Sequence, residues 1–196
     1  MKAEYTERQI QIFNASIKLI GKGGIQTLTT KNLAKEIGLS EAAIYRHFSS
    51  KVDILKGLLG YLKISILNRL KRVSNEKISP IKKIEKIILE QSKAFSDRTE
   101  IVVVLLSEGL YQNDKEVSDI VYSIMQESAA FYQAVIEEGQ EKGEIRSDLN
   151  SKQLTLIIMG TLRFNVIQWR LSGFSINLKE RCSQFFDTIC KLILNN

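Results

Sequence analysis

The chain has 196 residues, 44% of them hydrophobic and only one of them proline, which is enough apolar sequence for a packed core and excludes a disordered or fibrous chain. Its net charge of +6 is uneven, because residues 1–93 carry 18 Lys/Arg against 8 Asp/Glu and residues 94–196 carry 10 against 14. The longest aliphatic run spans six residues, 101–106, and is far below the ~18 needed to cross a bilayer.

The first predicted element is a helix over about residues 5–20, which ends at the glycine-rich run 21–24. Its apolar residues recur every three or four positions and form one stripe: Ile10, Phe13, Ile17 and Ile20.

Residues 28–55 predict two short helices joined by a tight turn, followed by the start of a third. Thr29 or Thr30 caps the first helix, Gly38 ends it and Ser40 caps the second. Ser49 or Ser50 caps the third. The inward-facing positions follow helical spacing: Leu33, Ala34, Ile37, Ala43, Ile44 and Phe48. The pattern is that of a helix-turn-helix, whose second helix fits the DNA major groove.

Over residues 8–59 the chain resembles the N-terminal domain of TetR-type transcriptional regulators. The resemblance consists of a helix ending in glycine, a Thr-Thr start, an aliphatic-Ala pair, Gly-aliphatic-Ser, and Tyr-x-x-Phe followed three residues later by Lys. It implies a homodimeric regulator, usually a repressor, that binds a palindromic double-stranded operator and responds to a small effector. The basic N-terminal half agrees with a DNA-binding end.

The same resemblance assigns roles within the DNA-binding segment. It places Tyr45, Lys51 and the hydroxyls of Thr29 and Thr30 on phosphates. It places Glu41, Ala42, Ala43, Arg46 and His47 at or near base edges, and the cap Ser40 completes the set. For Tyr45 a second interpretation stays open, in which its ring packs on the first helix.

The rest of the chain predicts further helices over about 50–73, around Ile84–Phe95, and over about 115–143, 150–171 and 178–194. The run 101–106 also fits a buried strand, but no partner strands are evident, so we expect a short helix reaching about Tyr111. The prediction is an all-α fold of about nine helices, with a three-helix DNA-binding domain at 1–51 and a helical ligand-binding and dimerisation domain at 52–196.

The helix at 150–171 is apolar on all sides, which requires contact with its own core and with something else. A second subunit is the expected partner, since the resemblance implies a dimer built from the last two helices; a central core helix in a monomer is the alternative. The expected interface residues are Leu156, Ile167, Cys182, Phe185, Phe186 and Ile189.

Aromatic and thioether side chains of the second domain could line an apolar effector cavity or be ordinary core. Arg163 lies within the apolar helix, where it would form an ion pair or anchor an acidic, lipophilic effector. The candidates for the cavity are Tyr61, Phe95, Tyr111, Met125, Phe131, Met159, Arg163, Phe164 and Trp169.

Catalytic chemistry finds no support in the sequence. His47 is the only histidine, so we expect no catalytic site, metal or cofactor, and the glutamates near Glu137 are expected to form a solvated helix face. Cys182 and Cys190 lie ~12 Å apart along one predicted helix, too far for a disulfide. With no signal-peptide core at the N-terminus, we expect a cytoplasmic protein without a membrane partner.

One other class of function stays open. The segment SEAAIYRHFSSK is also similar to that of nucleoid-occlusion factors, which bind DNA and restrain a cell-division polymer. On that interpretation the protein is a DNA-bound interaction module without a small effector. A filled C-terminal core with an exposed partner surface favours this alternative.

Overall fold

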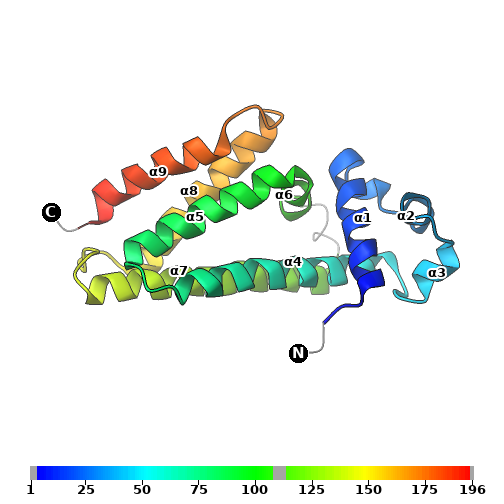
Figure 1. Ribbon diagram of the computed structural model, residues 1–196, viewed down its shortest axis with the longest axis horizontal. Helices are drawn as coiled ribbons and strands as arrows, with labels where there is room; N and C mark the ends of the chain where they lie inside the picture. The colour runs from blue at the N-terminus through cyan, green and yellow to red at the C-terminus, as the bar shows by residue number, and fades with distance from the viewer. Residues whose placement is uncertain (1–3, 108–113, 195–196) are drawn as a thin grey trace. The chain divides into compact units, whose positions relative to one another are not determined.

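The computed structural model describes residues 4–107 and 114–194. Within them the fold is all-α, as predicted, with nine α-helices and one short 3-10 helix (Figure 1). The elements are α1 (Glu7–Gly23), η1 (Ile25–Thr27), α2 (Thr30–Ile37), α3 (Glu41–Tyr45), α4 (Lys51–Ser74), α5 (Pro80–Asp97), α6 (Thr99–Leu105), α7 (Lys115–Glu141), α8 (Ser151–Leu171) and α9 (Leu178–Ile193).

The chain divides into two compact units, each of which is made of two segments that are separate in the sequence. Unit 1 comprises Met1–Ser65 and Thr99–Ile124, and unit 2 comprises Ile66–Arg98 and Met125–Asn196. Helices α4 and α7 each contribute residues to both units. A domain boundary at 51/52 remains a prediction.

Unit 1 is built around the apolar face of α1, where Phe13 is fully buried. Its ring lies 5.1 Å from that of Tyr5, 5.5 Å from Phe48 and 5.7 Å from Tyr61, between ring centroids. These edge-on and tilted aromatic contacts join the segment before α1, the connection between α3 and α4, and the first half of α4 in one core.

Helix α1 is longer than the glycine run suggested. It begins after the cap Thr6, which forms a capping box with Gln9, and continues through Gly21 to Gly23. Gly21 is required for close packing, because a Cβ there would lie 2.4 Å from Cγ of Glu100 on α6. Gly21 therefore marks an approach between two helices. The helix ends within the predicted glycine run, but three residues later than Ile20, at Gly23 with Gly24 as its cap.

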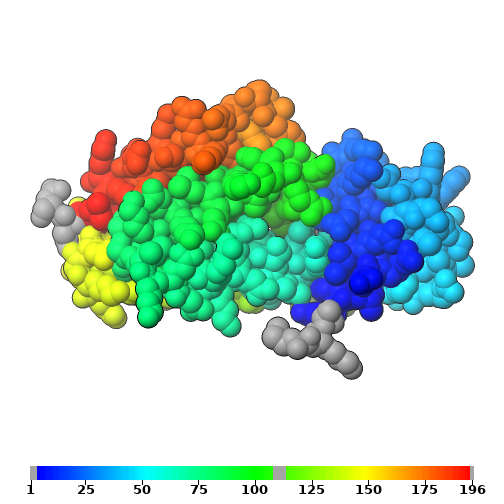
Figure 2. Space-filling view, in the orientation of Figure 1, coloured from blue at the N-terminus to red at the C-terminus, as the bar shows by residue number. Residues whose placement is uncertain are grey.

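In unit 2, α9 packs against α5 and α8, and the space-filling view shows α9 (orange to red) lying directly on α5 (green) (Figure 2). The buried face of α9 comprises Leu178, Cys182, Phe186, Ile189 and Ile193. Cys182, Phe186 and Ile189, which we expected at a subunit interface, therefore fill the core of their own chain. Burial raises the pKa of the Cys182 thiol to about 11, so this thiol stays protonated.

Helix α8 has two distinct apolar faces. One contributes Leu154, Ile158, Leu162, Val166 and Trp169 to the core of unit 2. The other is exposed within the chain: Leu156 is 62%, Ile157 50%, Phe164 58% and Leu171 80% exposed. Exposed apolar stripes of this kind mark interaction surfaces. Of the expected interface residues, Leu156 is exposed, and Ile167 and Phe185 are partly exposed.

Candidate nucleic-acid interface

The helix-turn-helix is held by local hydrogen bonds that the residue types dictate. Thr29 caps α2 by accepting from the backbone N–H of Asn32 at 3.1 Å, and Ser40 caps α3 by accepting from that of Ala43 at 3.2 Å. Between them Gly38 adopts a left-handed conformation, with φ +68° and ψ +36°, which only glycine adopts at low cost. Leu33, Ala34 and Ile44 are buried beneath this turn.

The residues around α3 present a polar surface to solvent. Side chains that are exposed here are those of Thr29, Ser40, Glu41, Ala42, Tyr45, Arg46, His47 and Lys51. Tyr45 is 53% exposed, which argues against the interpretation that its ring is packed on the first helix. A rigid apolar underside with a basic, hydrogen-bonding outer face is the form that a major-groove reader takes.

Two of the ten predicted DNA-binding residues are not freely exposed at the surface. Ala43 is only 8% exposed, so its methyl group packs into the core and the expectation that it lies near base edges is not supported. Thr30 is half-buried, and its hydroxyl donates to the Glu41 carboxylate at 2.6 Å. The sequence pattern gave no sign of this side-chain pair, because it joins residues eleven positions apart.

The start of α4 carries its own set of interactions. Ser50 accepts from the N–H of Asp53 at 3.1 Å, and Ser49 donates to the Asp53 carboxylate. Hydrogen bonds from Ser49, and then Ser50, lower the pKa of the Asp53 carboxyl, although burial opposes them. Lys51 donates from Nζ to the carbonyl of Ile25 at 3.2 Å, which offsets its unfavourable position at a helix N-terminus.

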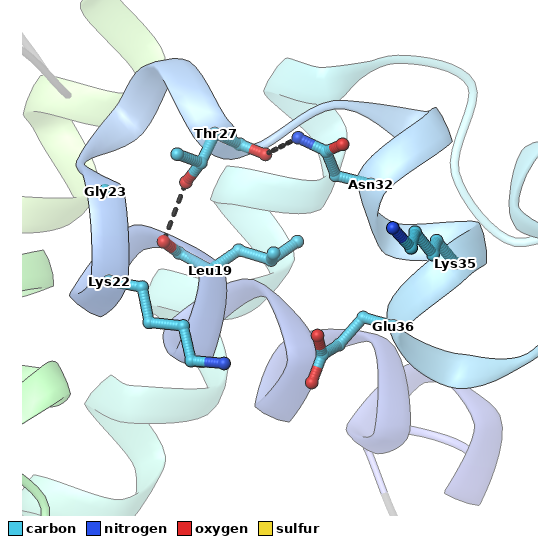
Figure 3. Close-up of a pocket in the computed structure, with 7 residues that line it drawn as sticks. All are labelled: Leu19, Lys22, Gly23, Thr27, Asn32, Lys35 and Glu36. Atoms are coloured by element: carbon cyan, nitrogen blue, oxygen red, sulfur yellow. Dashed lines mark hydrogen bonds between the residues drawn. The ribbon is translucent and has the colours of Figure 1, made fainter.

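A pocket of about 520 Å³ lies beside the helix-turn-helix in unit 1, between the end of α1, η1 and α2 (Figure 3). Its wall is fixed by Thr27, which donates to the carbonyl of Leu19 at 2.7 Å and accepts from Asn32 at 2.8 Å through its own carbonyl. The lining residues are Leu19, Lys22, Gly23, Thr27, Asn32, Lys35 and Glu36. None of them was an effector-pocket candidate.

The predicted effector-pocket residues are dispersed. Tyr61 belongs to the aromatic core of unit 1, and Tyr111 lies outside the described residues. In unit 2 Phe95 and Trp169 are buried, and Phe131 and Met159 are partly buried. Met125, Arg163 and Phe164 are exposed, so the expectation that they line an internal cavity is not supported. Arg163 reaches solvent, which removes its need for a buried partner.

One buried polar group in unit 2 was not foreseen. The Tyr132 side chain is 1% exposed, and its hydroxyl has no hydrogen-bond partner among the described residues. Burial, with a smaller contribution from Cys182, raises the pKa of this phenol above its ordinary value, so it is a neutral hydrogen-bond donor. A buried hydroxyl without a partner is costly and calls for an explanation.

Two capped helices joined at a left-handed glycine, with an exposed polar face over a buried apolar floor, are the geometry of helix-turn-helix DNA-binding proteins. The model of bacterial regulatory proteins of the tetR family matches residues 12–58, and that of the YsiA-like protein C-terminal region matches residues 62–194. The chain belongs to the TetR family and is a DNA-binding transcriptional regulator.

Known relatives extend over nearly the whole chain. The nucleoid occlusion factor SlmA of Aliivibrio fischeri is 23% identical over 181 residues, covering 91% of this chain and 92% of its own length. FadR of Bacillus subtilis, solved in complex with stearoyl-CoA, matches with a TM-score of 0.83 at 21% identity, covering 92% of this chain and 97% of its own. FadR of Bacillus halodurans gives a TM-score of 0.87 at 20% identity, covering 96% and 97%. At these identities the solved structures establish the fold.

Within residues 4–107 and 114–194, no helix is long and apolar enough to cross a membrane. No three histidine, cysteine, aspartate or glutamate side chains in that part of the chain are grouped so that they could hold a metal ion.

Proposed function

We propose that the protein is a homodimeric repressor that binds a palindromic operator and is released from it by a small, mainly apolar effector. The observation that carries the DNA-binding part is the exposed, capped helix-turn-helix over a buried apolar floor. In this proposal Tyr45, Lys51 and Thr29 contact phosphates, while Glu41, Ala42, Arg46 and His47 lie at base edges.

The dimer in this proposal forms through the exposed apolar face of α8 together with the exposed side of α9. Leu156, Ile157 and Phe164 lie on one stripe of α8, and Leu192 on α9 is 57% exposed. In a two-fold interface the same patch is buried on both subunits, so the apolar area removed from water is twice that of one stripe. It also sets the two recognition helices at half-sites separated by a helical turn or more, ~34–36 Å.

The proposed binding to an operator is tested by selection from random duplexes, which should return a palindrome. Affinity should also fall steeply with salt, because bound lysines and arginines release counterions from the DNA. Lys51→Ala should weaken binding to all sequences equally and lower the salt slope by about one unit. The control is Lys115→Ala, at the exposed first residue of α7. Binding that is insensitive to salt, or a wild type that selects no sequence, would contradict the proposal.

For the effector we propose an acyl compound that enters unit 2 and accepts a hydrogen bond from Tyr132. The support is the buried hydroxyl, which has no hydrogen-bond partner within the part of the chain that the structure describes, together with the stearoyl-CoA complex of the FadR relative. Such an effector releases DNA only if it binds the DNA-incompetent conformation more tightly than the DNA-bound one. Operator DNA must then weaken effector binding by the same factor.

Tyr132→Phe separates the two roles of this hydroxyl. Without effector the variant should be more stable, by about 1–3 kcal/mol, because an unpaired buried hydroxyl is removed while the ring remains. With stearoyl-CoA it should show a smaller thermal stabilisation and weaker operator release than the wild type. Tyr122→Phe, on an exposed tyrosine of the same helix, is the matched control. A less stable Tyr132→Phe protein would mean that the hydroxyl has a partner in the free chain.

A second candidate function has support from the similarity to SlmA over nine-tenths of the chain. In that proposal the protein is a DNA-bound interaction module of the nucleoid-occlusion type, with no small effector. The two candidates predict different results in a direct test. If the protein is an effector-released repressor, stearoyl-CoA, palmitate or an aromatic acid should release operator DNA. If it is an interaction module, none of them should do so, and a cell-division polymer should co-sediment with the DNA-bound protein.

A further inference from the structure

The first residues of the two helices in the helix-turn-helix are joined by a hydrogen bond between side chains. Thr30 opens α2 and Glu41 opens α3, and the Thr30 hydroxyl donates to Oε2 of Glu41 at 2.6 Å. We propose that Thr30 is a positioning residue, which holds the Glu41 carboxylate so that it reads a cytosine in each half-site. The inference rests on the proposed operator binding and names the base that this position recognises.

The hydroxyl chemistry of the adjacent threonines divides their roles. A threonine hydroxyl has one hydrogen to donate, and phosphate oxygens can only accept. Thr30 commits that hydrogen to Glu41. Thr29 instead accepts from the Asn32 N–H, so its own hydrogen remains free for a phosphate. The expectation that both hydroxyls contact phosphates is therefore revised: Thr29 contacts a phosphate and Thr30 positions Glu41.

The fold does not need the pair for its stability. The packing of α2 against α3 already follows from the buried Leu33, Ala34 and Ile44 and from the Gly38 turn. Glu41 is exposed, and a hydrogen bond there competes with water and adds little to folding. What the bond changes is the freedom of a flexible carboxylate that lies on the groove-facing side of α3. Fixing it before DNA binds reduces the entropy lost on binding.

An ionised carboxylate can only accept hydrogen bonds, and this decides which base it fits. One oxygen of Glu41 is used by Thr30, and further lone pairs remain for a base edge. In the major groove cytosine presents the N4 amine as a donor, whereas guanine presents O6 and N7 and thymine presents O4, all of them acceptors. Adenine offers its N6 amine beside the N7 acceptor and so fits less well. The fixed carboxylate therefore selects cytosine and repels guanine and thymine.

The test compares the base preferences of variants in selection from random duplexes, with affinity measured on the selected palindrome and on single-base variants of it. In Thr30→Val, which keeps the shape and removes the donor, cytosine preference at one symmetric position should fall by about 5–10-fold, at the low end of the discrimination that a single good base contact gives. Duplexes with another base at that position should bind as they do to the wild type. Thr30→Ser, which restores a hydroxyl, should behave like the wild type.

Two further variants complete the design. Thr29→Val should lower the affinity for all sequences equally, as expected for a phosphate contact. Because the same hydroxyl caps α2, circular dichroism must first show that this variant is folded like the wild type. Glu41→Gln should change the preferred base, since an amide both donates and accepts and can pair with adenine N6 and N7. Glu41→Gln also keeps the inference testable if Thr30→Val does not fold, which circular dichroism detects.

The outcomes distinguish this inference from the proposed function. If the wild type selects a palindrome and Thr30→Val weakens all sequences alike, Thr30 contacts a phosphate and the inference is overturned while operator binding stands. An unchanged preference in Thr30→Val also overturns it, because Glu41 then needs no positioning by Thr30. An unchanged preference in Glu41→Gln overturns it as well, because the carboxylate then reads no base. A wild type without any sequence preference overturns the proposed operator binding and the inference together.

Discussion

Phe164→Glu should convert the proposed dimer into monomers and lower operator affinity by ~10²–10⁴-fold, the contribution that linking two binding modules typically makes. Phe164 is 58% exposed within the chain, so the substitution leaves the monomer's core intact. In a dimer that buries this face, the same change places a carboxylate in an apolar seam without a partner, which is strongly unfavourable. Sedimentation equilibrium at micromolar concentration and fluorescence anisotropy with the operator measure the two effects.

A matched control exists at Tyr122, an aromatic residue that is 61% exposed on α7. Tyr122→Glu should leave both the dimer and operator binding unchanged. If Tyr122→Glu also yields monomers, the seam is not where we place it. A Phe164→Glu protein that remains dimeric would exclude the α8 face from the interface, and a monomeric wild type would overturn the architecture.

Phe164 was not among the interface residues expected from the sequence, whereas Phe185 and Ile189 were. Ile189 is 4% exposed and faces the core of unit 2. A charge there would destabilise the chain itself, and a loss of DNA binding would then reveal nothing about the dimer. Phe164 removes this ambiguity because its side chain is free of the chain's own core.

The parts of the fold that the sequence predicted well are those set by local hydrogen bonds. Thr29 and Ser40 cap their helices and Gly38 ends α2, because a hydroxyl two or three residues before an orphan N–H, and a glycine at a left-handed position, act within one turn. The buried positions beneath α3 follow from helical spacing alone. These features define most of the proposed DNA-binding surface.

Where a helix has two apolar faces, the sequence did not predict which of them is buried. In α9 the sequence offers both Phe185 and Phe186, and a stripe through either one fits the helical period. The structure buries Phe186 and leaves Phe185 partly exposed, a choice that the packing against α5 and α8 decides. In α8 apolar residues surround the axis, so periodicity could not distinguish the core face from the exposed face.

Contacts between residues that are distant in the sequence could not be predicted either. Three features depend on where separate elements meet: the Thr30–Glu41 pair, the bond from Lys51 to the Ile25 carbonyl, and the burial of the Tyr132 hydroxyl without a partner among residues 4–107 and 114–194. Gly21 is a further example. Its position is explained by the close approach of Glu100 from another helix, but in the sequence a glycine next to other glycines indicates only a helix end. Tertiary contacts therefore decide which polar residues are available for recognition.

The second large effect is expected at the Lys83–Glu138 ion pair of unit 2. Lys83 on α5 is 6% exposed, and its ammonium lies 2.8 Å from the Glu138 carboxylate on α7. Glu138→Leu leaves this buried ammonium without its partner. We expect a loss of about 2–4 kcal/mol in the free energy of unfolding, somewhat less than the usual ~3–5 kcal/mol because Glu138 is partly exposed.

The double variant Lys83→Met/Glu138→Leu distinguishes a lost partner from lost packing. With both charges replaced by apolar groups of similar size, stability should return to within about 1 kcal/mol of the wild type, since buried pairs are often no more stable than their apolar substitutes. Urea unfolding of the four proteins in this cycle, at one fixed protein concentration, gives the coupling energy directly. A loss in the double variant equal to the sum of the losses in Lys83→Met and Glu138→Leu would mean that the two residues do not interact energetically.

The pH dependence follows from the same carboxylate. Hydrogen bonds from Lys142, and then from Lys83, lower the pKa of Glu138 below its ordinary value. A carboxyl with a lowered folded-state pKa stabilises the fold at pH values above its unfolded pKa, about 4.3, and this contribution is lost as the pH falls through the folded value. The wild type should therefore lose stability on acidification more steeply than the double variant. If the two proteins keep a constant difference from pH 7 down to acid unfolding, the Glu138 carboxylate contributes nothing through its charge, and the buried ammonium of Lys83 must be stabilised by other groups.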